Sequence, residues 1–295
     1  MSWSEAASLT ENSPSEQLRA QALRVLDSTR ARLPVRAALL VGSAARGDAD
    51  LLSDLDLIAY VDELPDQSLL AEIRENVGGT DPFAREGTEH FRGEEFNLAG
   101  IRTELSFLTV ARVESHLERV FESVDEFDSP LQKVLSGLLE GFPLHGEDLI
   151  KKWRARVREY PDALRSKIIE RHWKFEPLWY FGAAIARRDA ELWRLDILLD
   201  AAFDLLAVLA ALNRLYFARF ELKRTRTFVA SMSVAPPRLV ERLESLFRLE
   251  PSAAATELER LVEETRELVL RELPGLDLHM RYPPGTRQRA WSNSG

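Results

Sequence analysis

The 295-residue chain has no cysteine, which excludes disulfide bonds, thiolate metal sites and cysteine nucleophiles. This composition fits a reducing compartment, and we expect a cytoplasmic protein. Long apolar runs are also absent, because Asp200 and Asp204 interrupt the most apolar region, residues 197–212. We therefore expect no membrane span. Residues 1–6 also lack the basic start and apolar run of a secretion signal.

Basic residues are in the minority, with 39 Lys and Arg against 48 Asp and Glu and a formal net charge of −9. Proteins that bind polymeric nucleic acid usually present a broad basic face. We therefore do not expect such a partner. Local basic clusters at 151–158 and 219–226 are large enough for a small anionic ligand.

The first third of the chain alternates between helical and strand patterns. Ser13-Pro14-Ser15-Glu16 is a capping box with proline at the first helical position, and it predicts a helix over 14–33. Further elements follow in order: a strand over 37–41, a glycine-bearing turn, a strand over 54–61, a helix over 68–77, an irregular stretch over 80–94, and a hairpin of 96–99 with 103–110. This order indicates a mixed sheet with flanking helices.

The pattern changes after residue 112 to long helical segments with few glycines. Helices are predicted at about 114–123, 129–139, 161–187, 190–217, 236–248 and 252–272. We therefore predict a first domain over 14–112, an all-helical domain over 113–280, and a loose tail over 281–295.

Two acidic residues stand out in the second strand. A strand has a period of two, so Asp54 and Asp56 project from one face while Leu55 and Leu57 point into the core. Like charges at such a distance repel, and a cation between them relieves the repulsion. Oxygen ligands indicate Mg²⁺ or Mn²⁺ rather than zinc.

Gly42-Ser43 ends the preceding strand, where a missing β-carbon lets a phosphate approach the backbone and the hydroxyl adds a donor. A phosphate beside two carboxylates requires a metal, so the two features together predict a metal–triphosphate site. Residues 41–47 lack the glycine spacing of a dinucleotide fingerprint, and no Gly-Lys-Ser/Thr of a P-loop occurs in the chain. An EF-hand loop starting at Asp48 fails at Leu52 and Ser53.

Gly-Ser followed ten residues later by Asp-x-Asp resembles the signature of the DNA polymerase beta-type nucleotidyltransferase superfamily. The segments Ser-Ala-Ala-Arg-Gly and Ser-Asp-Leu-Asp-Leu are similar to those of small bacterial members that modify aminoglycosides or lincosamides, and to those of minimal nucleotidyltransferases. The resemblance implies that Asp54 and Asp56 are catalytic metal ligands and that Gly42 and Ser43 contact the triphosphate. It also implies a third carboxylate on an adjacent strand, for which Glu104 is the match.

The resemblance extends more weakly into the helical region. Residues 211–223 are similar to a segment in which a lysine faces the triphosphate, which implies nucleotide-binding roles for Asn213, Tyr216 and Lys223. The alternative is a solvated basic segment near a helix C-terminus, which is favourable through the helix dipole.

Asp196, Asp200 and Asp204 recur every fourth residue on an otherwise apolar helix. This spacing is mildly destabilising without compensation. One interpretation is an acidic stripe that binds a cationic or polyhydroxylated acceptor, and the other is a solvated stripe or pairing with Arg194 or Lys174. The five histidines have no metal-ligand spacing, and no role is assigned to them.

We therefore expect an α+β fold, with an N-terminal polymerase-beta-like nucleotidyltransferase domain and a C-terminal helical bundle. The resemblance implies transfer of a nucleoside monophosphate, AMP from ATP, to a hydroxyl of a small molecule such as an antibiotic. Two Mg²⁺ ions held by Asp54, Asp56 and Glu104 would serve the reaction, with release of pyrophosphate. The alternatives are a protein-modifying minimal nucleotidyltransferase of a toxin–antitoxin system and a non-catalytic nucleotide-binding module.

Overall fold

The computed structural model describes residues 13–122, 129–219 and 222–289. The chain forms two compact units, Met1–Ser123 with Val134–Glu159, and Val124–Lys133 with Tyr160–Gly295. Each unit is described by itself, over its described residues. The predicted domain boundary after residue 112 stays a prediction.

The first unit is built on a six-stranded mixed sheet in the order β3-β4-β5-β2-β1-β6. Its strands are β1 (Val35–Val41), β2 (Leu55–Val61), β3 (Thr80–Ala84), β4 (Phe91–Leu98), β5 (Ile101–Thr109) and β6 (Phe142–His145). Its helices are α1 (Pro14–Arg30), α2 (Gly42–Arg46), α3 (Gln67–Val77), α4 (Val110–Glu122) and α6 (Glu147–Arg158), with the end of α5 (Ser129–Glu140). β2 and β5 pair in parallel, and the other pairs are antiparallel.

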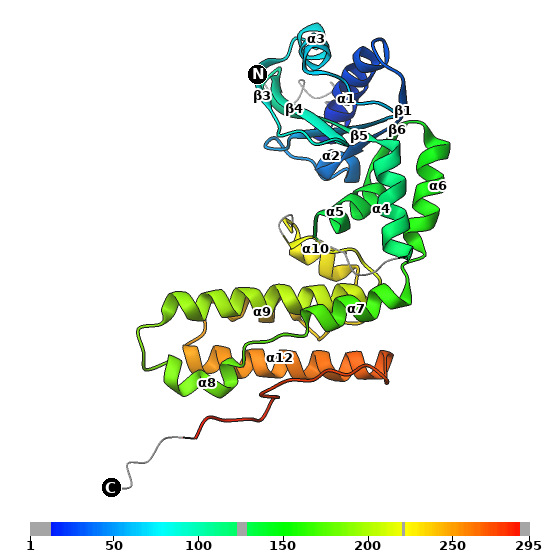
Figure 1. The fold of residues 1–295 in the computed structure, drawn as a ribbon. Helices are drawn as coiled ribbons and strands as arrows, with labels where there is room; N and C mark the ends of the chain where they lie inside the picture. The colour runs from blue at the N-terminus through cyan, green and yellow to red at the C-terminus, as the bar shows by residue number, and fades with distance from the viewer. Residues whose placement is uncertain (1–12, 123–128, 220–221, 290–295) are drawn as a thin grey trace, which may run out of the picture. The chain divides into compact units, whose positions relative to one another are not determined.

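Helices α1 and α3 cover one face of this sheet (Figure 1). The capping box is confirmed, since Ser13 Oγ accepts from the Glu16 amide at 3.3 Å and Glu16 Oε2 accepts from the Ser13 amide at 2.8 Å. The core on this face includes Leu55 and Leu57 of β2 with Leu105 and Phe107 of β5. Because strand side chains alternate, Asp56 and Glu104 project from the opposite face.

One part of that opposite face is covered by α6. The buried Tyr60 ring of β2 meets Trp153 of α6 edge-on, with ring centroids 5.0 Å apart. Burial raises the pKa of the Tyr60 phenol, because the charged form would lose its solvation. Asp56 lies four residues before Tyr60 on the same strand and is only partly buried.

Three local predictions in this unit are wrong. The expected irregular stretch 80–94 contains β3 and the start of β4, and the expected turn after β1 is the short helix α2. β3 is an edge strand whose five residues are all exposed, so it has no apolar alternation to reveal it. β6 interrupts the region predicted to be all helical, and its four residues include Pro143, which disfavours a strand prediction.

The second unit is helical over its described residues. Its helices are α7 (Asp162–His172), α8 (Leu178–Ile185), α9 (Glu191–Leu212), α10 (Thr225–Ala230), α11 (Leu239–Ser245) and α12 (Pro251–Glu272). Helix α7 packs on α9, while α12 packs on both α8 and α9. The mixed sheet with flanking helices and the helical C-terminal part confirm the predicted fold class.

Two predicted helices of this unit have different limits. The helix predicted over 161–187 is divided into α7 and α8, because Pro177 lacks the amide that a continuous helix needs there. The helix predicted over 190–217 ends at Leu212, and Arg214 adopts a left-handed conformation with φ 57°. None of the described helices is long and apolar enough to cross a bilayer.

The described part of the predicted loose tail is bound to the second unit. Glu259 of α12 accepts hydrogen bonds from the Gly285 amide at 2.7 Å and from Arg287 at 2.7 and 2.8 Å. The Tyr282 ring stacks on Tyr180 of α8 with centroids 4.3 Å apart. Residues 281–289 are therefore anchored by specific contacts, and the remainder of the predicted tail, 290–295, lies outside the described residues.

Candidate functional site

Three carboxylates form a row across neighbouring strands where β1 ends and β2 and β5 begin. Asp56 of β2 is the register partner of Glu104 of β5, and Glu104 is in turn the partner of Glu95 of β4. Side chains of register partners project from the same face of a sheet. The sheet therefore places Asp56, Glu104 and Glu95 side by side on the face opposite α1 and α3.

Glu95 was missed by the sequence reasoning, although the hairpin contains a signal for it. Leu98 pairs with Ile101 across the two-residue turn Ala99-Gly100. Counting back three residues on β4 and forward three on β5 gives the pair of Glu95 with Glu104. The sequence predicts an irregular stretch over 80–94, which hides the start of β4 and with it the register of Glu95.

Asp54 comes just before β2, and its side chain is 31% exposed. Together with the row of three it forms what we call the carboxylate cluster: Asp54, Asp56, Glu95 and Glu104. The side chains of Glu95 and Glu104 are 20% and 25% exposed, so the cluster is half-buried but accessible.

Two arginines are paired with the carboxylate cluster. Arg102 donates to Glu95 Oε2 from Nε at 2.9 Å and from Nη2 at 2.7 Å, and its Nη1 lies 3.7 Å from Asp54 Oδ2. Hydrogen bonding to Glu95, together with the nearby charges of Asp54 and Asp56, raises the pKa of Arg102.

Arg85, from the end of β3, forms an ion pair with Glu104 Oε1, and its Nε lies 4.0 Å from Glu95 Oε1. Ser106 Oγ also donates to Glu104 Oε1 at 2.8 Å. Each arginine thus spans two members of the cluster, and Glu95 is common to both.

Gly42 and Ser43 follow β1 directly beside Asp56. Gly42 has a left-handed φ of +73°, and a β-carbon there would lie 2.9 Å from Asp56 Oδ2. Ser43 lies in the first turn of α2, and its carbonyl accepts from the amides of Gly47 and Asp48 at 3.0 and 3.2 Å. Glycine therefore satisfies both the backbone conformation and the close approach of the Asp56 carboxylate.

The segment after Gly42 is fixed from α1. Arg19 donates to the carbonyl oxygens of Ala44 and Ala45 at 3.0 and 2.8 Å. Arg46 Nε lies 3.5 Å from Asp48 Oδ2, which forms an ion pair across the end of α2. These contacts hold Ser43 next to the carboxylate cluster.

Replacing Gly42 by alanine should strain the site. Alanine at a left-handed φ and a methyl group 2.9 Å from Asp56 Oδ2 should together lower the free energy of unfolding of the first unit by about 1–2 kcal/mol. Hydrogen exchange of the β1 and β2 amides under increasing urea measures this change. Gly100→Ala is the matched control, because φ there is +88° but no atom lies within 4 Å of the added carbon. If both variants lose the same stability, the contact with Asp56 contributes nothing.

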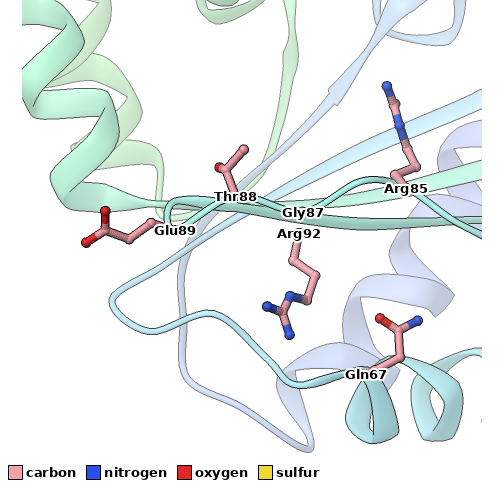
Figure 2. A pocket seen from close by; sticks show the side chains of 6 residues that line it. All are labelled: Gln67, Arg85, Gly87, Thr88, Glu89 and Arg92. Carbon is pink, nitrogen blue, oxygen red and sulfur yellow. The ribbon is translucent and has the colours of Figure 1, made fainter.

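A shallow hollow lies beside the loop from β3 to β4. It is lined by Gln67, Arg85, Gly87, Thr88, Glu89 and Arg92. Figure 2 shows Arg85 and Arg92 projecting from opposite sides of the ribbon, with Arg92 on the side of Gln67. Arg85 alone belongs to both the hollow and the surroundings of the carboxylate cluster, so the hollow does not replace the predicted site.

The donor types of the cluster suit a hard cation such as Mg²⁺, which prefers carboxylate oxygens. Across residues 13–122, 129–219 and 222–289, however, no group of three or more Asp, Glu or His side chains is arranged to hold a metal ion. The carboxylates of Asp54 and Glu104 instead face guanidinium groups. The donor set fits the metal, while the side-chain arrangement is that of a carboxylate–arginine network.

The nucleotide-binding candidates of the helical region lie in the second unit. The Asn213 amide donates to the carbonyls of Leu209 and Val234 at 2.7 and 2.8 Å, and its Oδ1 accepts from the Ser233 and Val234 amides. Asn213 therefore links the end of α9 to the 233–234 segment.

Tyr216 and Lys223 differ from each other in exposure. Tyr216 is buried against Tyr160, with centroids 4.9 Å apart, and burial raises the pKa of its phenol. Lys223 is exposed. The carboxylate cluster is built from first-unit residues alone, and the roles of Asn213, Tyr216 and Lys223 in nucleotide binding stay predictions.

The aspartates of α9 have partners other than those expected. Asp200 pairs with Arg219 at 2.7 Å and Asp204 with His172 Nδ1 at 2.8 Å, while Asp196 is exposed. Arg194, an expected partner, bonds Glu191 instead. The charge of the stripe is thus partly compensated within the second unit, and its role in acceptor binding stays a prediction.

Residues 23–126 match the sequence model of a family described as "Nucleotidyltransferase domain". The matched range includes Gly42, Ser43 and all four members of the carboxylate cluster. No curated protein matches the chain.

Two solved structures are similar to the chain at low identity. A nucleotidyltransferase-like protein from Exiguobacterium sibiricum 255-15 has 13% identity and a TM-score of 0.42, over 86% of this chain and 78% of that one. A structure named "putative nucleotidyltransferase from H. pylori" has 12% identity and a TM-score of 0.23, over 86% of this chain and 94% of that one.

Proposed function

We propose that the protein is a Mg²⁺-dependent nucleotidyltransferase that transfers AMP from ATP to a hydroxyl group of a small molecule. The observation that carries the proposal is the register pairing of Asp56 with Glu104 on adjacent parallel strands. It is supported by Gly42, whose missing side chain leaves room for the Asp56 carboxylate at the end of β1. The family match over residues 23–126 agrees with this chemistry at the level of the reaction class.

In this proposal Asp54, Asp56 and Glu104 would hold the metal. The chemistry that Mg²⁺ supplies in such a site is stabilisation of charge on the attacking and leaving oxygens. Ser43 donates its hydroxyl to a phosphate oxygen, and Gly42 lets that phosphate approach the backbone. Glu104, which accepts a hydrogen bond from the Ser106 hydroxyl, would accept the proton of the acceptor hydroxyl as nucleophilic attack begins.

The acceptor is assigned from charge. Asp196, Asp200 and Asp204 give α9 an acidic stripe, which would attract a cationic or polyhydroxylated molecule. An aminoglycoside antibiotic carries both features. Lys223, Asn213 and Tyr216 are proposed as contributors to nucleotide binding from the second unit.

The test is transfer of label. The protein is incubated with each α-³²P-labelled nucleoside triphosphate, with and without Mg²⁺, in the presence of aminoglycosides, lincosamides or a protein extract. We expect Mg²⁺-dependent labelling of a small molecule from ATP, with release of pyrophosphate. Label on a protein would replace the small-molecule acceptor by a protein one. Absence of label on every acceptor, together with absence of Mg²⁺-dependent ATP binding, would refute the proposal that the protein is an enzyme.

A further inference from the structure

The carboxylate cluster and its two arginines carry an inference about metal binding, which rests on the proposed function. Four carboxylates and two guanidiniums leave a formal charge of −2 within the network. That charge balances one divalent cation. A second divalent cation needs further negative charge, either from an arriving triphosphate or from departure of the arginines.

The arginines bind the same oxygen atoms that a cation would use. Arg85 occupies Glu104 Oε1, and Arg102 lies 3.7 Å from Asp54 Oδ2. A guanidinium and a hard cation cannot both lie at full contact with one carboxylate oxygen without repelling each other.

The side chains of Arg85 and Arg102 are 37% and 62% exposed, so each can turn from the carboxylates toward solvent. Glu95 holds Arg102 through two hydrogen bonds to one oxygen, at 2.7 and 2.9 Å. Its contact to Arg85 is longer, at 4.0 Å. Glu95 is therefore suited to keep Arg102 at the site when Asp54 binds a cation in place of Arg102.

We propose that Arg85 and Arg102 are positioning residues that compete with the divalent cation for Glu104 and Asp54. Glu95 is the residue that retains Arg102 after displacement. In the metal-free protein the arginines neutralise carboxylates that would otherwise repel one another. When a cation binds, Glu104 loses its contact with Arg85 and gains a contact with the metal. Because breaking the arginine contacts costs free energy, the arginines lower the affinity of the site for the metal.

The test measures Mn²⁺ binding without nucleotide, by the loss of the free Mn²⁺ electron paramagnetic resonance signal. Arg85→Gln and Arg102→Gln should each bind Mn²⁺ about 3- to 10-fold more tightly than the wild type, because a competing charge is removed. The metal-free variants should melt at a lower temperature, and Mn²⁺ should raise that temperature more than in the wild type. Arg102→Lys keeps the charge and should bind Mn²⁺ as the wild type does.

Arg36→Gln is the matched control. Arg36 forms a similar ion pair with Asp62, at the other ends of β1 and β2, and its loss should leave Mn²⁺ affinity unchanged. If the arginines merely support the structure, the glutamine variants will bind Mn²⁺ equally or more weakly, and the competition is refuted. If neither the wild type nor any variant binds Mn²⁺, the metal assignment in the proposed function fails as well.

Discussion

Asp56→Asn should reduce transfer by about 10³-fold or more and leave the fold intact. Asp56 is the member of the carboxylate cluster that is paired in register with Glu104 and also lies against Gly42. Loss of a metal-binding carboxylate removes several kcal/mol of transition-state stabilisation, and each 1.36 kcal/mol is a factor of ten in rate. The fold should survive, because asparagine has nearly the same shape and removes one of several like charges.

The measurement is kcat/KM for labelled AMP transfer, together with the melting temperature. Asp62→Asn is the matched control, because Asp62 follows the same strand at its other end and is 58% exposed. We expect Asp62→Asn to retain full activity. An Asp56→Asn variant that keeps more than a tenth of wild-type activity would show that Asp56 is not a metal ligand.

Arg74→Ala should lower the free energy of unfolding of the first unit by about 3–5 kcal/mol, the usual cost of leaving a buried charge without its partner. Arg74 of α3 bonds Glu94 Oε1 of β4 at 2.8 Å, and the two side chains are only 12% and 3% exposed. Glu94 lies on the core face of the sheet, next in sequence to Glu95 on the other face. Truncation of Arg74 leaves the buried Glu94 carboxylate without its ion-pair partner.

Hydrogen exchange of the β4 and β5 amides under increasing urea measures this loss for the first unit separately. Arg36→Ala, which breaks the exposed pair with Asp62, should cost at most about 1 kcal/mol. Adding Glu94→Leu to Arg74→Ala should recover part of the stability, because an apolar side chain then replaces the unpaired charge. A loss of less than 1 kcal/mol for Arg74→Ala would mean that Glu94 finds water or another partner.

The elements best predicted from the sequence are those whose signals are local. The capping box begins α1, and the alternation of Asp54 to Leu57 predicts β2 together with the face that carries the carboxylates. Glu104 was assigned by resemblance, and its register with Asp56 is what the strand order produces. Its role as a metal ligand stays a prediction.

The side-chain contacts that could not be predicted from the sequence join residues far apart along the chain. The pairing of Arg85 with Glu104 depends on β3, an exposed edge strand without a hydrophobic pattern. The Asp204 contact with His172 joins residues 32 positions apart, and neither helical spacing nor charge order indicates it. Side-chain choices of this kind follow from packing, which periodicity does not encode.

The sheet order also has a consequence for synthesis on the ribosome. β6, which pairs with β1, comes from residues 142–145, after the chain has contributed residues 129–133 to the second unit. Until those residues emerge, the nascent sheet has β1 as an open border, lined by the apolar run Ala37–Val41. Open borders of this kind recruit other strands. Pairing with β6 therefore removes this open border of β1 from the finished sheet.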